Sequence, residues 1–226
     1  MLLAIDSATQ ILSIALHDGR ALRAEWSLDA GRQHSALLAP MIQQLMRQAK
    51  TDREDLQALA VAVGPGSFTG VRIGVALAKG MAAVADLPLV PLTTLEIVLE
   101  AHAPSRYQWP LIATAPAGRS RVIWAKYAPA GDAWVLRRPA EISTWESLLA
   151  ACKPPVTISG EISRAGRQAI ETAQQAGAHI DLPPATDRLR RAGHLAEIAW
   201  RRLRESQAAR PYPAADVRPV YLKSPG

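Results

Sequence analysis

Two short segments carry residues that could bind a phosphate group. Asp6-Ser7-Ala8-Thr9 directly follows one apolar run, and residues 64–74 (Gly-Pro-Gly-Ser-Phe-Thr-Gly-Val-Arg-Ile-Gly) follow another. A glycine-rich loop between a strand and a helix can direct backbone N–H groups at an anion. The candidate nucleotide-binding residues are therefore Asp6, Ser7, Thr9, Gly64, Gly66 and Ser67.

The glycine run lacks both common phosphate-binding fingerprints. No Lys-Ser or Lys-Thr pair follows its glycines, as a P-loop requires, and Gly70 comes one residue too late after Gly64 and Gly66 for a dinucleotide fingerprint. The alternative is a tight strand-to-helix turn in which Ser67 or Thr69 caps the helix. Physical chemistry alone favours that turn.

The histidines and the cysteine give little support for a metal site or a catalytic nucleophile. The chain has five histidines, and no two stand four residues apart, the spacing that places two imidazoles on one helix face. The one cysteine, Cys152, ends a helical pattern, where a small core residue is the expected role. We expect no metal site, no catalytic residue and no resident cofactor, with ATP as the nucleotide that the two loops would take.

Composition describes a folded chain. Its 226 residues are 49% hydrophobic with a net charge of +6, and one cysteine excludes an intramolecular disulfide. No basic stretch precedes the first apolar run, and no run of about 18 uncharged apolar residues occurs. We expect a cytoplasmic protein with no membrane partner.

A basic stretch late in the sequence has two interpretations, a solvated helix end or a contact to tRNA phosphates. It contains Arg188, Arg190, Arg191, Arg201, Arg202 and Arg204.

The hydrophobic pattern occurs twice in the same order. The first half predicts strands at 2–5, 11–16, 21–28, 59–63 and 87–92, with helices at 34–48 and about 70–85. The second half predicts strands at 111–114, 121–127, 133–137, 156–159 and 179–182, with helices at 144–152, up to 176 and at 193–205. The repeat indicates an α/β fold of two tandem ribonuclease-H/actin-like domains, each a mixed sheet flanked by helices. We place them at residues 1–103 and 104–226, with the last helix and tail able to pack back on the first.

The two helices of the first half carry distinctive faces. Gly70, Gly74, Ala78 and Ala82 stand four apart on one face, which lets another element approach closely. The covering element is either part of the same domain or a helix of another chain. Helix 34–48 offers a complementary apolar row at Leu37, Met41 and Leu45.

The motifs together resemble one family. The run Gly64–Gly74, the preceding Asp6-Ser7-Ala8-Thr9 and His34-Ser35 at the head of an apolar helix look like TsaB. This is the non-catalytic bacterial subunit of the machinery that makes threonylcarbamoyladenosine in tRNA. The ending Arg218-Pro219-Val220-Tyr221-Leu222-Lys223 is similar to that family's Pro-x-Tyr-Leu-Arg ending.

The resemblance implies a scaffold function. Family members pair with the catalytic relative TsaD through helices of the first domain, and the ATPase TsaE joins them. We therefore expect a TsaD-type partner, a TsaE-type ATPase, access to tRNA through the complex, and a homodimer when the protein is alone. Gly74→Leu should then block pairing and leave the monomer folded. The expected contact residues are His34, Leu37, Leu38, Met41, Leu45, Gly70, Val71, Arg72, Gly74, Val75 and Ala78.

The second half argues against a nucleotide site of the actin type, which needs an acidic loop from each half. The matching loop, residues 113–118, contains no acid, and Pro116 stands where similar sequences have Asp. An actin-like ATPase or kinase remains the alternative function, and a metal-dependent peptidase is the weakest one. Asp6 itself also fits a strand-end turn residue that bonds its own backbone.

Overall fold

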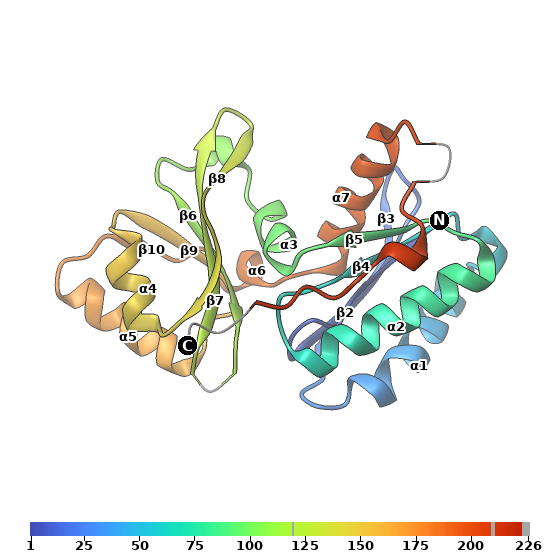
Figure 1. The fold of residues 1–226 in the computed structure, drawn as a ribbon, viewed down its shortest axis with the longest axis horizontal. Helices are drawn as coiled ribbons and strands as arrows, with labels where there is room; N and C mark the ends of the chain where they lie inside the picture. Colours follow the sequence, from blue (N-terminus) through green and yellow to red (C-terminus); the bar gives the residue numbers. More distant parts are fainter. Residues whose placement is uncertain (119, 209–210, 223–226) are drawn as a thin grey trace. The chain divides into compact units, whose positions relative to one another are not determined.

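The computed structural model describes residues 1–118, 120–208 and 211–222, and it divides into two compact units (Figure 1). Unit 1 contains residues 1–97 and 191–220, and unit 2 contains residues 98–190 and resumes at Tyr221. Each unit has its own five-stranded mixed sheet. These units differ from the contiguous ranges 1–103 and 104–226, because the last helix and most of the tail belong to unit 1. Whether each unit folds as an independent domain stays a prediction.

The sheet of unit 1 has the strand order β3-β2-β1-β4-β5. Its strands are β1 (Leu2–Asp6), β2 (Ile11–His17), β3 (Leu22–Asp29), β4 (Ala58–Ala62) and β5 (Leu89–Leu92). β1 pairs with β2 antiparallel and with β4 parallel, and β4 pairs with β5 parallel. β1 and β4 are buried along their whole length, as expected for near-continuous apolar strands covered on both faces.

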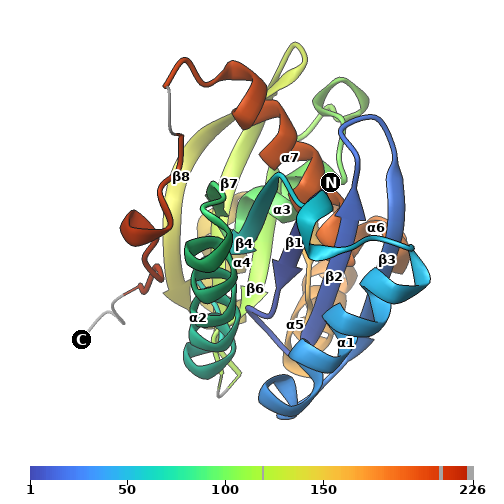
Figure 2. The ribbon, with the colours of Figure 1, turned by 90° about the vertical axis from the view of Figure 1, so that its right-hand side faces the viewer.

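Helices cover both faces of this sheet. α1 (His34–Gln48) and α2 (Phe68–Ala85) lie on one face, and α7 (Ala192–Glu205) packs across all five strands on the other (Figures 1 and 2). α2 is long and apolar enough to cross a membrane by length and composition alone, a test that core helices of soluble proteins also pass. In the structure its small-residue face packs on β4 and β1.

The sheet of unit 2 repeats that topology with the order β10-β9-β6-β7-β8. Its strands are β6 (Leu111–Pro116), β7 (Val122–Ala130), β8 (Ala133–Ser143), β9 (Val156–Gly160) and β10 (Ile180–Asp181). α4 (Trp145–Cys152) and α5 (Arg164–Gln175) join the sheet in one core around Trp124, Trp145 and Ile158. The predicted duplication of mixed sheets flanked by helices is therefore confirmed.

The differences from the predicted elements are local. β8 extends to Ser143, six residues beyond the predicted end, with register shifts along its pairing with β7. The short helices α3 (Thr94–Glu100) and α6 (Ala185–Arg188) were not predicted. Both are too brief to show a helical period in the sequence.

Candidate functional site

The glycine loop forms a strand-to-helix turn bonded to the turn after β1. The Ser67 Oγ accepts the Gly70 N–H at 3.2 Å, so Ser67 caps α2. The Ser67 N–H donates to the Ala8 carbonyl at 2.7 Å, and the Ser7 hydroxyl donates to the Gly70 carbonyl at 2.8 Å. Of the two predicted caps, Ser67 is the one observed.

Close contact between these two segments explains the glycine spacing. A Cβ atom at Gly66 would lie 2.1 Å from the Ala8 carbonyl oxygen, and one at Gly70 would lie 2.2 Å from that of Ser7. At Gly74 it would lie 2.2 Å from the Ser7 Oγ. The small-residue face is therefore covered by this chain itself. The expectation that Gly74→Leu leaves the monomer folded is wrong, because leucine would overlap a buried, hydrogen-bonded serine.

The remaining candidate nucleotide residues also have partners within unit 1. The Asp6 Oδ1 accepts the Ala8 N–H at 3.0 Å, the strand-end turn anticipated as the alternative. The Thr9 carbonyl accepts a hydrogen bond from the His34 Nε2 at 2.6 Å, which fixes the start of α1. Gly64 has a φ of +95°, the left-handed region that favours glycine. Nucleotide binding by this loop stays a prediction.

The corresponding loop of unit 2 is a tight hairpin. The Ala117 N–H donates to the Arg121 carbonyl at 3.1 Å, and the Arg121 N–H donates to the Gly118 carbonyl at 3.0 Å. Pro116 pairs with Val122 at the end of β6. Among residues 1–118, 120–208 and 211–222, no three His, Cys, Asp or Glu side chains group as metal ligands.

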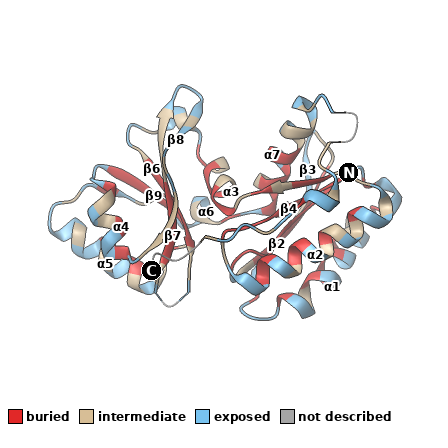
Figure 3. Cartoon of the chain, in the orientation of Figure 1, coloured by how far each residue is buried: buried red, intermediate tan, exposed pale blue. Residues whose placement is uncertain are grey.

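The predicted partner-contact residues divide into a buried and an outward set. Arg72 is exposed on α2 and Leu37 is partly buried on α1. The others are buried within unit 1 and belong to its interior: His34, Leu38, Met41, Leu45, Gly70, Val71, Gly74, Val75 and Ala78. The helices as partner elements stay a prediction, but a partner would meet their outward sides (Figure 3).

The outward side of α2 carries an apolar groove that the sequence analysis missed. The groove has a volume of about 460 Å³, and Val84, one of its lining residues, is 79% exposed. Phe68, the one phenylalanine of the chain, is 58% exposed at the start of the same helix and contacts the Arg72 guanidinium. The groove is lined by Arg53, Leu56, Leu59, Ala76, Leu77, Gly80, Met81, Val84, Ala85 and Leu87.

The equivalent helix of unit 2 lacks such a face. Gly160-x-x-Ser163-x-x-Gly166 repeats Gly64-x-x-Ser67-x-x-Gly70, and in both helices the serine Oγ accepts the N–H of the glycine three residues on. The exposed residues of α5 are all polar: Arg164, Arg167, Gln168, Glu171, Thr172, Gln174 and Gln175. This internal sequence repeat could have identified the matching helices and hence the unusual apolar exposure of α2.

A second cluster that the sequence did not reveal lies in unit 2. The His102 Nε2 is 2.7 Å from the Ser159 Oγ, and its Nδ1 is 2.5 Å from the Tyr107 hydroxyl. Burial, together with the carboxylates of Asp181 and Asp187, raises the pKa of Tyr107. Both His102 and Ser159 are buried, so the cluster cross-links the sheet with the segment after α3 and is not an exposed nucleophile.

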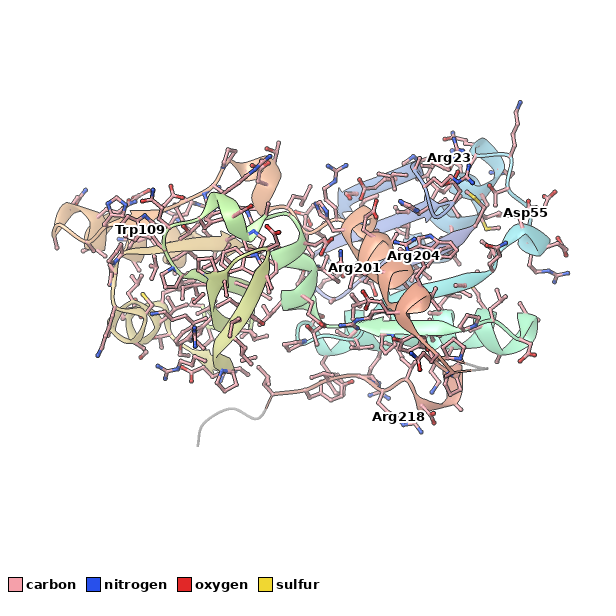
Figure 4. All side chains as sticks on the ribbon, turned by 90° about the horizontal axis from the view of Figure 1, so that it is seen from above. Arg23, Asp55, Trp109, Arg201, Arg204 and Arg218 are labelled. Atoms are coloured by element: carbon pink, nitrogen blue, oxygen red, sulfur yellow. The ribbon has the colours of Figure 1, made fainter. Side chains whose placement is uncertain are left out.

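The late arginines bond mostly within the chain. Arg190 is buried with its Nη1 2.6 Å from the Glu161 Oε1, while Arg191 pairs with Glu25. Arg202 pairs with Glu96. Arg201 and Arg204 also lie on α7 (Figure 4), and the Arg204 Nη1 donates to the Gly19 carbonyl at 3.5 Å. Contact with tRNA phosphates stays a prediction.

Comparison with known proteins establishes the family. The family model described as TsaD, tRNA N6-adenosine threonylcarbamoyltransferase, matches residues 28–199, more than half of the chain. The chain belongs to the TsaD family. Its relatives include TsaB proteins. The structure of YeaZ from Pseudomonas aeruginosa matches with a TM-score of 0.73 at 25% identity, covering 98% of this chain and 99% of that one.

Two curated relatives share the name "tRNA threonylcarbamoyladenosine biosynthesis protein TsaB". The Escherichia coli (strain K12) protein is 36% identical over 126 residues, 56% of this chain and 54% of that protein. The Bacillus subtilis (strain 168) protein is 39% identical over 95 residues, 42% of each. The chain thus spans about half the length of the curated relatives it matches. The resemblance to TsaB read from the motifs is confirmed, and so is the actin-like fold.

Proposed function

We propose that this cytoplasmic protein is a non-catalytic subunit that binds a TsaD-type transferase. In this role it supports transfer of a threonylcarbamoyl group to the adenosine beside the anticodon of tRNA, with a TsaE-type ATPase as a further partner. The names of the TsaB relatives support the pathway. The match to a transferase family model supports the view that this chain shares its ancestry with a catalytic protein.

The apolar groove on α2 is the observation that carries the proposal. A single exposed apolar residue is ordinary on a protein surface, but a contiguous apolar groove marks an interaction site. The groove presents Leu77, Met81 and Val84 along one side of a helix, the spacing at which a second helix packs. Because α5 has the same position in unit 2 and is polar, the architecture alone does not require this apolar side.

Self-association follows from the same surface. When no transferase is present, a second copy of this chain offers the same α2 side, and two such surfaces related by a two-fold axis bury each other. We therefore propose a homodimer that dissociates as the transferase binds. Burial of Val84 alone would contribute about 1.5–3 kcal/mol to either pairing.

Several observations support a non-catalytic role. The Asp6 and Ser67 side chains accept backbone N–H groups, and Ser7 is bonded to Gly70. Burial raises the pKa of the Cys152 thiol, which disfavours the nucleophilic thiolate. These groups stabilise the turns and the core.

Reconstitution of the transfer reaction tests the proposal. Purified TsaD-type and TsaE-type proteins from the same organism are incubated with tRNA and a threonylcarbamoyl donor, with and without this chain, and modified adenosine is quantified. We expect modification only with all components, and none from this chain alone. Full-rate modification without it would contradict the proposal. Saturable ATP binding by the isolated chain, lost on Asp6→Ala, would instead favour the actin-like ATPase.

A further inference from the structure

The tail of the chain packs along α2 as a segment here called the C-terminal strap (residues 212–220; Figures 1 and 4), which contains the short 3₁₀ helix η3 (Ala214–Asp216). At its start, the Leu89 N–H donates to the Tyr212 carbonyl at 2.9 Å. At its end, the Val220 N–H donates to the Val63 carbonyl at 2.7 Å. The strap thus bonds to the start of β5 and to the residue after β4. Of the ending read from the sequence, Lys223 lies outside the described residues.

Lys79 bonds the middle of the strap. Its Nζ donates to the Ala215 carbonyl at 3.2 Å and to the Val217 carbonyl at 3.0 Å. Val217 is buried against the core of unit 1. Apart from Lys79, the polar side chains of α2 are those of Thr69 and Arg72. A charged donor with two carbonyl acceptors contributes more than a neutral hydrogen bond, so Lys79 is the main polar contact between helix and strap.

The strap also contacts the glycine loop. A Cβ atom at Gly64 would lie 2.8 Å from the Val220 carbonyl oxygen, so only glycine allows this approach. The Gly64 carbonyl in turn accepts the Thr94 N–H at 2.8 Å, which joins the loop to α3. The loop that starts α2 is therefore held on one side by the Ser7-Ala8 turn and on another by the strap.

The strap and the groove lie on opposite flanks of α2. On a helix of about 3.6 residues per turn, Gly74, Ala78 and Ala82 form the stripe that faces the sheet. The groove residues Leu77, Met81 and Val84 lie on one side of that stripe, and Lys79 lies on the other. The sheet and the strap thus hold α2 on two sides, α1 packs against it as well, and the groove beside Leu77, Met81 and Val84 is left for a partner.

We propose that the C-terminal strap is a latch, closed by Lys79, that holds α2 and the glycine loop in the position where the groove receives a partner helix. Lys79 is a positioning residue for partner binding and does not contact the partner. The part of the inference that concerns the partner rests on the proposed function, whereas the clamping of α2 does not.

Amide hydrogen exchange and partner affinity, measured on the same proteins, test the latch. The variants are Lys79→Met, which removes the donor, Lys79→Arg, which restores one, and a chain ending at residue 211. The controls are Lys50→Met on an exposed lysine and a chain ending at residue 222. A synthetic peptide of residues 211–222 is added to the shortened chain.

We expect Lys79→Met to raise amide exchange over residues 64–80 about tenfold, and to weaken binding of the TsaD-type partner by a similar factor. Lys79→Arg and the peptide should each restore both quantities, and neither control should change them. Unchanged exchange in Lys79→Met and in the shortened chain would overturn the latch. If the wild-type chain binds no partner, the proposed function fails, and the exchange data still decide whether the strap clamps α2.

Discussion

The glycines of α2 show how one residue type has different functions within one helix. Gly70 and Gly74 allow the Ser7 turn to approach the helix, whereas a Cβ atom at Gly80 would meet no atom within 4 Å. Sequence spacing identifies the first two as a stripe, but it does not say what covers them. The covering turn is more than 60 residues away in the chain, with Ser7 and Gly70 bonded across 63 positions.

Alanine substitutions should separate these functions. We expect Gly70→Ala to destabilise the chain by about 1–3 kcal/mol through overlap with the Ser7 carbonyl. Gly80→Ala should stabilise it by about 0.5–1 kcal/mol, because alanine restricts the unfolded chain and favours the helix. Urea unfolding of both variants measures the difference. Equal stabilities would contradict the close approach seen at Gly70.

Asp18 should make folding stability depend on acid pH. Its Oδ1 accepts the N–H groups of Ala21 and Arg20, both at 2.8 Å, and its Oδ2 pairs with Arg23. These contacts hold the pKa of Asp18 well below its ordinary value of 3.8. Because the pKa of Asp18 is lower in the folded state, its carboxylate stabilises the fold at a pH above its unfolded-state pKa. This stabilisation is lost as the pH falls through the folded-state pKa. We expect Asp18→Asn to flatten the acid side of the stability profile, and an unchanged profile would count against the turn.

At the scale of elements, α7 depends on tertiary partners for its first turn. Its preceding residue, Arg191, supplies no capping oxygen. The Ala192 N–H donates instead to the Ser13 Oγ at 2.9 Å, and the Gly193 N–H donates to the Glu25 Oε1 at 2.7 Å. β2 and β3 thus cap a helix that follows them by more than 160 positions.

Removal of this distant cap should loosen α7. Glu25→Ala deletes the acceptor of the Gly193 N–H and the partner of Arg191, at a cost of about 1–2 kcal/mol. The matched control is Glu171→Ala on the exposed side of α5. Thermal unfolding measures both, and a Glu25→Ala melting temperature equal to that of the control would show that α7 needs no such cap.

The predicted and observed elements differ where the local sequence pattern carries the least information about secondary structure. The long periodic helices and the buried strands were predictable, because period and apolar content are local properties. α3 and α6 have too few residues for a period, and the extent of β8 is set by its pairing with β7. The docking of α7 on the first sheet is likewise decided by contacts that its own sequence does not encode.

At the scale of the molecule, the two units share one topology but differ in the residues that their equivalent helices, α2 and α5, expose. The repeated Gly-x-x-Ser-x-x-Gly turn starts α2 in unit 1 and α5 in unit 2, yet α2 carries an apolar groove whereas the exposed residues of α5 are polar. The sequence predicted contact through the small-residue side of α2, and partner binding by this helix stays a prediction. The most regular feature of the α2 sequence, the small-residue stripe, is buried against the sheet of unit 1.

The reactivity of the Cys152 thiol measures how often the core of unit 2 opens, and this measurement needs no substitution. The thiol is buried in the second core, and this burial raises its pKa. We expect slow reaction with a thiol reagent at neutral pH in the native protein and fast reaction in urea, with the rate rising as unit 2 opens. Labelling with a chromogenic disulfide measures this rate. Rapid native labelling would show that the second core is open.

Partner binding through the outward side of α2 is the central claim, and size-exclusion chromatography with light scattering tests it most directly. This chain is mixed with the TsaD-type protein of the same organism as wild type, as Val84→Asp in the groove, and as Ala83→Asp on the adjacent exposed position outside it. We predict a heterodimer for the wild type and for Ala83→Asp, formed as the homodimer disappears, and two separate species for Val84→Asp. Equal complex formation by all three chains, or none by the wild type, would contradict the account.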